Sequence, residues 1–213
     1  MLGVGTAIFG VFFFINYFVQ NVWGYSALGT GLAFLPLTAM LLVASGAAAT
    51  LVPRVGARPL LLAGGTALAG GMYWLSRISE HGTYAGGLLG PGLVIGTGFG
   101  LLIVPLTLVG LARVGEADSG AAASLLNSGR QVGGSIGLAV LGTVAWTVVS
   151  DSARAQAAAA ARAGSRVSAA LQYRQALAAG FDRAFLVAAA SALLIAVIAV
   201  TMIRIRRADL AGS

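Results

Sequence analysis

The fold is decided by long apolar stretches such as GAAASLLNSGRQVGGSIGLAVLGTVAW, residues 120–146, in which Arg130 is the single charged residue. An α-helix rises about 1.5 Å per residue, so about 20 apolar residues cross the roughly 30 Å hydrocarbon core of a bilayer. The stretch exceeds that length. We therefore predict a membrane-spanning helix here.

Further stretches of this kind occur on both sides of it, and most connections between them are short. The predicted spans are residues 2–20, 28–52, 59–75, 84–112, 120–149 and 183–203. Residues 150–182 are a long connector rich in Ala and Arg, which we expect to be a partly helical extracytoplasmic loop with Asp151 as a helix cap. The predicted fold class is an all-α integral membrane protein, a six-transmembrane-helix bundle.

The composition agrees with a bilayer environment and excludes several classes of function. Apolar residues make up 58% of the 213 residues, 9% are charged, and the mean hydropathy is +0.92. A soluble domain carries roughly 25% charged residues. The basic residues are all arginines and form no basic stripe with interleaved aromatics, so we expect no nucleic-acid partner.

Enzyme and metal chemistry find little support in the sequence. Without lysine or cysteine there is no P-loop and no thiolate metal site, and His81 is the single histidine. The patterns HExxH and GxSxG are absent as well. We expect no enzyme activity, no cofactor and no metal site.

Arginines between spans indicate the orientation, because Lys and Arg are enriched in cytoplasmic loops. If both termini are cytoplasmic, the inner side carries Arg54, Arg58, Arg113, Arg204, Arg206 and Arg207. The short outer loops then carry Arg77. The long connector opposes this assignment, because it places Arg154, Arg162, Arg166, Arg174 and Arg183 outside. On the short loops we favour a cytoplasmic C-terminus.

The fifth span carries a polar stripe next to a glycine stripe. Ser124, Asn127, Gln131 and Gly134 recur at helical spacing, and so do Gly129, Gly133 and Gly137. Arg130 lies roughly 15 Å along the helix axis from the start of the span. A charge at that depth costs several kcal/mol unless it meets water or a partner. Arg130 therefore either lines a cavity or bonds helix-end carbonyls while its side chain extends to the cytoplasmic edge.

Two other spans have polar or irregular features that permit two interpretations. In the first span, Asn16 and Gln20 lie one turn apart among aromatic residues. They either line a site for a lipophilic cation or lie among interfacial anchors. In the fourth span, glycines at four-residue spacing with Pro91 and Pro105 predict a kinked packing seam or a helix that bends during transport.

The connection between the second and third spans carries a family motif. Residues 46–65, GAAATLVPRVGARPLLLAGG, resemble the cytoplasmic loop signature of the major facilitator superfamily. The matching positions are Gly46, Arg54, Gly56 and Arg58. Pro53 replaces the acidic residue of the signature and Ala57 replaces a basic one, which puts a charge-relay role in doubt.

Three further stretches resemble one branch of that superfamily: residues 17–36, 124–144 and 180–190. They are similar to the C-terminal six helices of the fourteen-helix EmrB/QacA-like drug:proton antiporters. The resemblance implies proton-driven export of small hydrophobic or cationic organic compounds across the plasma membrane. It also implies that both termini are cytoplasmic and that a missing N-terminal bundle supplies the proton-carrying acids.

On this resemblance, the substrate pathway would include Asn16, Gln20, Asn127, Arg130 and Gln131. Arg54 and Arg58 would pair with acids of the neighbouring bundle. Two other hypotheses remain open at this point. The chain is a truncated membrane remnant without transport of its own, or it is a half-size transporter that works as a dimer.

Overall fold

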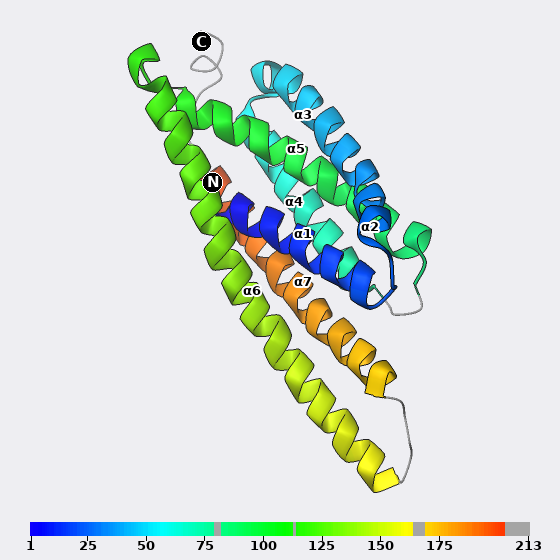
Figure 1. Ribbon diagram of the computed structural model, residues 1–213. Coiled ribbons are helices and arrows are strands. Elements are labelled where there is room, and N and C mark those ends of the chain that lie inside the picture. Colours follow the sequence, from blue (N-terminus) through cyan, green and yellow to red (C-terminus); the bar gives the residue numbers. More distant parts are fainter. Residues whose placement is uncertain (79–81, 113, 164–168, 203–213) are drawn as a thin grey trace.

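The computed structural model describes residues 1–78, 82–112, 114–163 and 169–202, and its regular elements are all helices (Figure 1). In chain order they are α1 (Leu2–Asn21), α2 (Ala27–Ala33), α3 (Leu35–Val55), α4 (Ala57–Leu75), η1 (Tyr84–Leu89), α5 (Gly90–Leu111), η2 (Glu116–Asp118), α6 (Ser119–Ala163) and α7 (Ala169–Met202). This agrees with the predicted all-α class. In hydrocarbon a helix satisfies its backbone groups internally.

Five helical segments of the described chain are long and apolar enough to cross a membrane: Leu2–Asn21, Ala27–Val55, Tyr84–Leu111, Glu116–Ala159 and Gln172–Ala199. The 19-residue helix α4 is not among them. Arg58 in its first turn and its several glycines lower its hydropathy. The predicted count of six spans is therefore not confirmed, although α4 is packed within the bundle.

Two of these segments are interrupted near prolines. Pro36 has no N–H to donate to the carbonyl of Leu32, and the helix is broken at Phe34, between α2 and α3. Pro91 likewise cannot donate to an earlier carbonyl, and the turn before α5 is the π-helix η1. The Tyr84 hydroxyl donates to the carbonyl of Ala33 at 3.1 Å and so joins the two interruptions.

Residues 150–182, predicted as a loop, are the two arms of a helical hairpin wherever the structure describes them. Helix α6 continues to Ala163 and α7 begins at Ala169, and Figure 1 shows both arms extending beyond the end of α1. Alanine has the highest helix propensity, which favours continuation of α6. Asp151 is therefore not a cap. It lies within α6 and pairs with Arg154 at 3.4 Å.

Helix packing follows a repeated scheme. Helix α1 packs against α6 and α7, and α5 packs against α3 and α4. Helix α4 also packs against α7. When the first three spans (α1, α2–α3, α4) are exchanged with the last three (α5, α6, α7), the pairs α1–α6 and α5–α3 correspond, and so do α1–α7 and α5–α4. The bundle is thus built from two similar three-span units.

Glycines bring the helices into backbone contact. A Cβ atom on Gly100 of α5 would lie 2.6 Å from the Cβ of Ala44 and 2.7 Å from the carbonyl oxygen of Leu41, both on α3. A Cβ on Gly98 would lie 2.7 Å from the backbone nitrogen of Leu68 on α4. Small residues at helix interfaces permit this approach. The glycine spacing of the fourth predicted span therefore marks a packing seam.

Tryptophan and tyrosine gather at one end of the bundle, the end from which the hairpin extends. The chain has 3 Trp and 5 Tyr: Trp23, Trp74, Trp146, Tyr17, Tyr25, Tyr73, Tyr84 and Tyr173. Ring contacts join Tyr17 to Trp146 at 5.5 Å and Trp23 to Tyr25 at 6.1 Å. Arg54 and Arg58 lie at the opposite end, where α3 meets α4. Such aromatic residues are typical of a membrane–water boundary.

We expect Gly100→Leu to destabilise the bundle by about 1–3 kcal/mol or more, because the added side chain forces α3 and α5 apart. Gly70→Ala on α4 is the matched control, since no heavy atom lies within 4 Å of the added Cβ. The control should be neutral or slightly stabilising. Thermal unfolding in detergent measures both variants. Equal melting temperatures for them would contradict the seam.

Single-cysteine labelling tests how the hairpin lies relative to the membrane, since the native chain has no cysteine. Ala157 on the hairpin lies about 57 Å along α6 from Ser119, which exceeds the roughly 40–45 Å thickness of a bilayer. A membrane-impermeant maleimide should label Ala157→Cys and Gly115→Cys from opposite sides. Ile136→Cys, on the exposed apolar face between them, should react slowly. Labelling of the first two from one side would refute this arrangement.

Candidate functional site

Helices α1 and α6 meet along a glycine seam that places the polar residues of α6. A Cβ on Gly133 or Gly137 would overlap Leu2 or Thr6 of α1, and one on Gly5 would overlap the carbonyl of Arg130. The Thr6 hydroxyl donates to the carbonyl of Gly133 at 2.8 Å across the seam. The glycine stripe predicted in the fifth span thus faces α1 and fixes the rotation of α6.

Arg130 lies beside this seam, half-buried, and its partner is an amide. Its guanidinium donates to Oδ1 of Asn127 at 2.6 Å, one turn earlier on α6. Both residues line a pocket of about 150 Å³ with Thr107 of α5 and Met1. Arg130 is roughly 16 Å along the axis from Ser119, the first residue of α6. The structure thus brings Asn127 and Arg130 together at a solvent-sized cavity.

Gln131 lies on a different face of α6 from that pocket. It is exposed, and the hydroxyl of Ser135 donates to its backbone carbonyl at 3.2 Å. Ser124, Ser128 and Ser135 are exposed with it. This polar face is not covered by the described helices. A polar face of this kind in a membrane bundle is suited to water or to another protein element, rather than to lipid.

Asn16 and Gln20 form a second polar pair, on α1. The amide of Gln20 donates to Oδ1 of Asn16, which is exposed. Asn16 is 11 residues from Gly5, the residue that touches the backbone of Arg130, so the two pairs are roughly 16 Å apart along α1. The structure therefore does not bring all the predicted pathway residues into one cluster.

Most of the loop motif lies at the junction of α3 and α4. Gly56 has φ +86° and ends α3, a conformation that favours glycine. Arg54 is exposed in the last turn of α3, and Arg58 is exposed in the first turn of α4. Gly46 is exposed on α3 about 15 Å away, with no heavy atom within 4 Å of an added Cβ.

A group of residues at the aromatic end was not predicted as a site. Phe13 of α1 and Trp146 of α6 line a groove of about 590 Å³ with the hydroxyl residues Thr143, Thr147 and Ser150. The spacing of these hydroxyl residues around Trp146 was the available signal in the sequence. It was weak, because Ser and Thr are common in membrane helices and bond to their own backbone.

Metal binding is not supported by the described residues, among which no group of three or more His, Asp or Glu could hold an ion. The polar residues of α1 and α6 are amides and hydroxyls, with Arg130 as the charge nearest the bundle centre. These groups bind by hydrogen bonding and charge.

Arg130 and Asn127 allow a test of whether the arginine serves the fold. We expect Asn127→Leu to lower stability by about 1–3 kcal/mol, because it leaves the guanidinium without its acceptor. Arg130→Met keeps the length of the side chain and removes a costly charge, so stability should be equal or higher. Thermal unfolding in one detergent compares them. A loss for Arg130→Met as large as that for Asn127→Leu would assign Arg130 a structural role.

Known transporters are similar to much of this chain. A cephamycin export protein of Amycolatopsis lactamdurans is 41% identical over 153 residues, 71% of this chain and 32% of that protein. A puromycin resistance protein of Streptomyces alboniger is 40% identical over 141 residues, 65% of this chain and 28% of that protein. An uncharacterized MFS-type transporter of Mycobacterium tuberculosis is 34% identical over 145 residues, 68% of this chain and 27% of that protein.

The chain therefore spans less than a third of the length of these curated relatives. No protein-family model matches it. The relatives are named for export, resistance or transport, and none of the three is named as an enzyme. Together with the apolar helices, they make this chain a multi-pass membrane protein that is similar, over about two thirds of its length, to MFS-type export and resistance transporters.

Proposed function

We propose that the chain is the C-terminal six-helix bundle of a proton-coupled multidrug exporter, an EmrB/QacA-like antiporter of the major facilitator superfamily. Its substrates are small hydrophobic or cationic organic compounds. The names of the relatives support export, and the repeated three-span packing supports a half-transporter. In this proposal a second bundle supplies the other wall of the pathway and the acids that carry protons.

Arg130 is the observation that carries this proposal. An arginine on a membrane helix costs several kcal/mol in hydrocarbon, and it is tolerated where it faces water or a polar partner. Here it lies half-buried next to a cavity of about 150 Å³, and it is held by a neutral amide. With no carboxylate in this contact, its charge remains available to a solute or to an acid of the other bundle.

The remaining predicted pathway residues have supporting roles in the proposal. Gln131 lies on the uncovered polar face of α6, where it would meet the other bundle or the solute. Asn16 and Gln20 offer amide groups nearer the aromatic end of α1. The polar groups thus lie at successive depths along the bundle, as a pathway requires. Alternating access would expose them to each side in turn.

We further propose that the protein lies in the plasma membrane with a cytoplasmic C-terminus. Arg54 and Arg58 at one end and the aromatic residues at the other support this orientation. Arg113, Arg166, Arg204, Arg206 and Arg207, which were also used in the charge assignment, lie outside the described residues. The exposed guanidinium of Arg54 would pair with acids of the other bundle at the cytoplasmic surface.

Inverted membrane vesicles containing the protein test this function. We expect a proton gradient to drive uptake of a fluorescent organic cation such as ethidium, and a protonophore to abolish it. Arg130→Ala should lower the rate at least tenfold, because it removes the charge from the pathway. Arg154→Ala is the control, since that arginine is 81% exposed on the hairpin.

Other outcomes of this experiment decide against the proposal. The absence of gradient-driven uptake by the wild-type protein would favour the remnant hypothesis. Uptake that persists unchanged in Arg130→Ala would remove that residue from the pathway. Cross-linked dimers in membranes that transport without any second bundle would favour the half-size transporter.

A further inference from the structure

The groove beside α1 and the outer part of α6 is a second candidate binding site, separate from the pocket at Arg130. Its volume is about 590 Å³, within the range of about 300–1,000 Å³ that is usual for small-molecule sites. Trp146 lies 16 residues from Arg130 on α6, or about 24 Å along the axis. The groove was not among the predicted sites, and its chemistry differs from that of the pocket.

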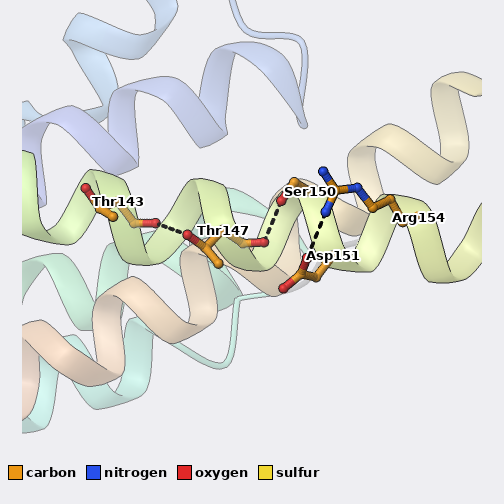
Figure 2. Close-up of polar contacts among 5 residues, drawn as sticks. All are labelled: Thr143, Thr147, Ser150, Asp151 and Arg154. Carbon is orange, nitrogen blue, oxygen red and sulfur yellow. Dashed lines mark hydrogen bonds and ion pairs between the residues drawn. The ribbon is translucent and has the colours of Figure 1, made fainter.

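The hydroxyl groups in the wall of the groove present acceptors to it. Thr143, Thr147 and Ser150 donate at 2.8 Å to the carbonyls of Ala139, Thr143 and Thr147 respectively. Figure 2 shows how the last two of these bonds link the three side chains along α6. A hydroxyl has one hydrogen and two lone pairs. Because each hydrogen is already committed to the helix, only lone pairs remain for a ligand.

Aromatic rings give the groove its apolar surface. Phe13 is 39% exposed and Trp146 is 38% exposed, although both lie in a bundle where other large rings are fully buried. Trp146 is held edge-on by Tyr17 at 5.5 Å and by Phe181 at 6.2 Å. The face of an aromatic ring is partially negative and attracts cations, most strongly for tryptophan. Rings and hydroxyls thus favour the same sign of charge.

None of the eight residues that line the groove carries a formal charge. The nearest charges along α6 are Asp151 and Arg154, which pair with each other at 3.4 Å. Figure 2 shows this pair beyond Ser150, at the outer end of the run of hydroxyls. An anionic ligand would therefore meet lone pairs and ring faces without a donor from these hydroxyls. A cation would meet complementary groups.

We infer that this groove binds organic cations with a flat aromatic body, with Trp146 and Phe13 against the body and the oxygens of Thr143, Thr147 and Ser150 near the charge. The inference rests on the proposed export function for its physiological role, and it deepens that function by naming the substrate class. The groove acts as a charge filter near the aromatic end of the bundle. Anionic compounds of the same size are excluded from it.

Binding to the protein in lipid nanodiscs tests the inference. The probes are a naphthyl trimethylammonium ion, the tert-butyl naphthalene of nearly the same shape, and a naphthalene sulfonate. Each is measured against nanodiscs without protein, with the change in Trp146 fluorescence as the signal in a Trp23→Phe, Trp74→Phe background. We expect the cation to bind at least tenfold more tightly than either of the other probes.

Isosteric variants assign the selectivity to the groove. The double variant Thr143→Val, Thr147→Val removes two acceptors at nearly constant volume, so it should weaken the cation at least fivefold and the neutral probe less than twofold. The matched control is Thr66→Val, Thr97→Val, since these two hydroxyls also donate to their own helices at 2.8 Å but do not line the groove. Circular dichroism and size-exclusion profiles confirm the fold of each variant.

The outcomes separate this inference from the export proposal. Equal affinity for the cation and its neutral isostere would overturn the inference, and so would an equal loss in the control pair. If vesicles containing the protein show no gradient-driven uptake while cation selectivity depends on Thr143 and Thr147, the export function fails and the binding site stands. If uptake proceeds but none of the groove variants changes binding, the reverse holds.

Discussion

The backbone contact between α1 and α6 is the constraint on which the functional geometry depends. It requires Gly133 and Gly137 on one helix and Gly5 on the other, because any Cβ at these positions would overlap the facing helix. Water does not drive helix association in lipid, so close packing and interhelical hydrogen bonds replace it. The bond from Thr6 to the carbonyl of Gly133 is one of these. Together they fix which residues of α6 remain uncovered.

That rotation gives α6 three functional surfaces. Arg130 and Asn127 face a small pocket toward α5, and Gln131 lies on an uncovered polar face. Nearer the aromatic end, Thr143 and Thr147 line the groove beside Phe13. The surfaces differ in chemistry, since the pocket offers a guanidinium and the groove offers acceptors and ring faces. A transporter needs such differences to release at one depth what it admits at another.

The hairpin shows how an aqueous segment is joined to a membrane bundle. Helix α6 has 45 residues, or about 68 Å, which exceeds the membrane thickness. Its outer part is alanine-rich and charged, and it pairs with the first part of α7. Phe181 of α7 contacts Phe14 and Tyr17 of α1 together with Trp146, so the base of the hairpin is tied to the aromatic end. The hairpin therefore continues the bundle as a rigid extension.

The sequence by itself determined the membrane environment, the approximate helix positions, the glycine seams and the Asn127–Arg130 pair, because these follow from hydropathy and from the helical repeat along one segment. It did not determine that residues 150–163 and 169–182 form a hairpin, since an alanine-rich segment is equally suited to a solvated connector. Only the tertiary structure decided that Asn16 and Gln20 lie apart from Arg130, and that Phe13 meets Trp146 across a groove. These relations depend on the rotation of α1 against α6, which is set by contacts between residues more than a hundred positions apart.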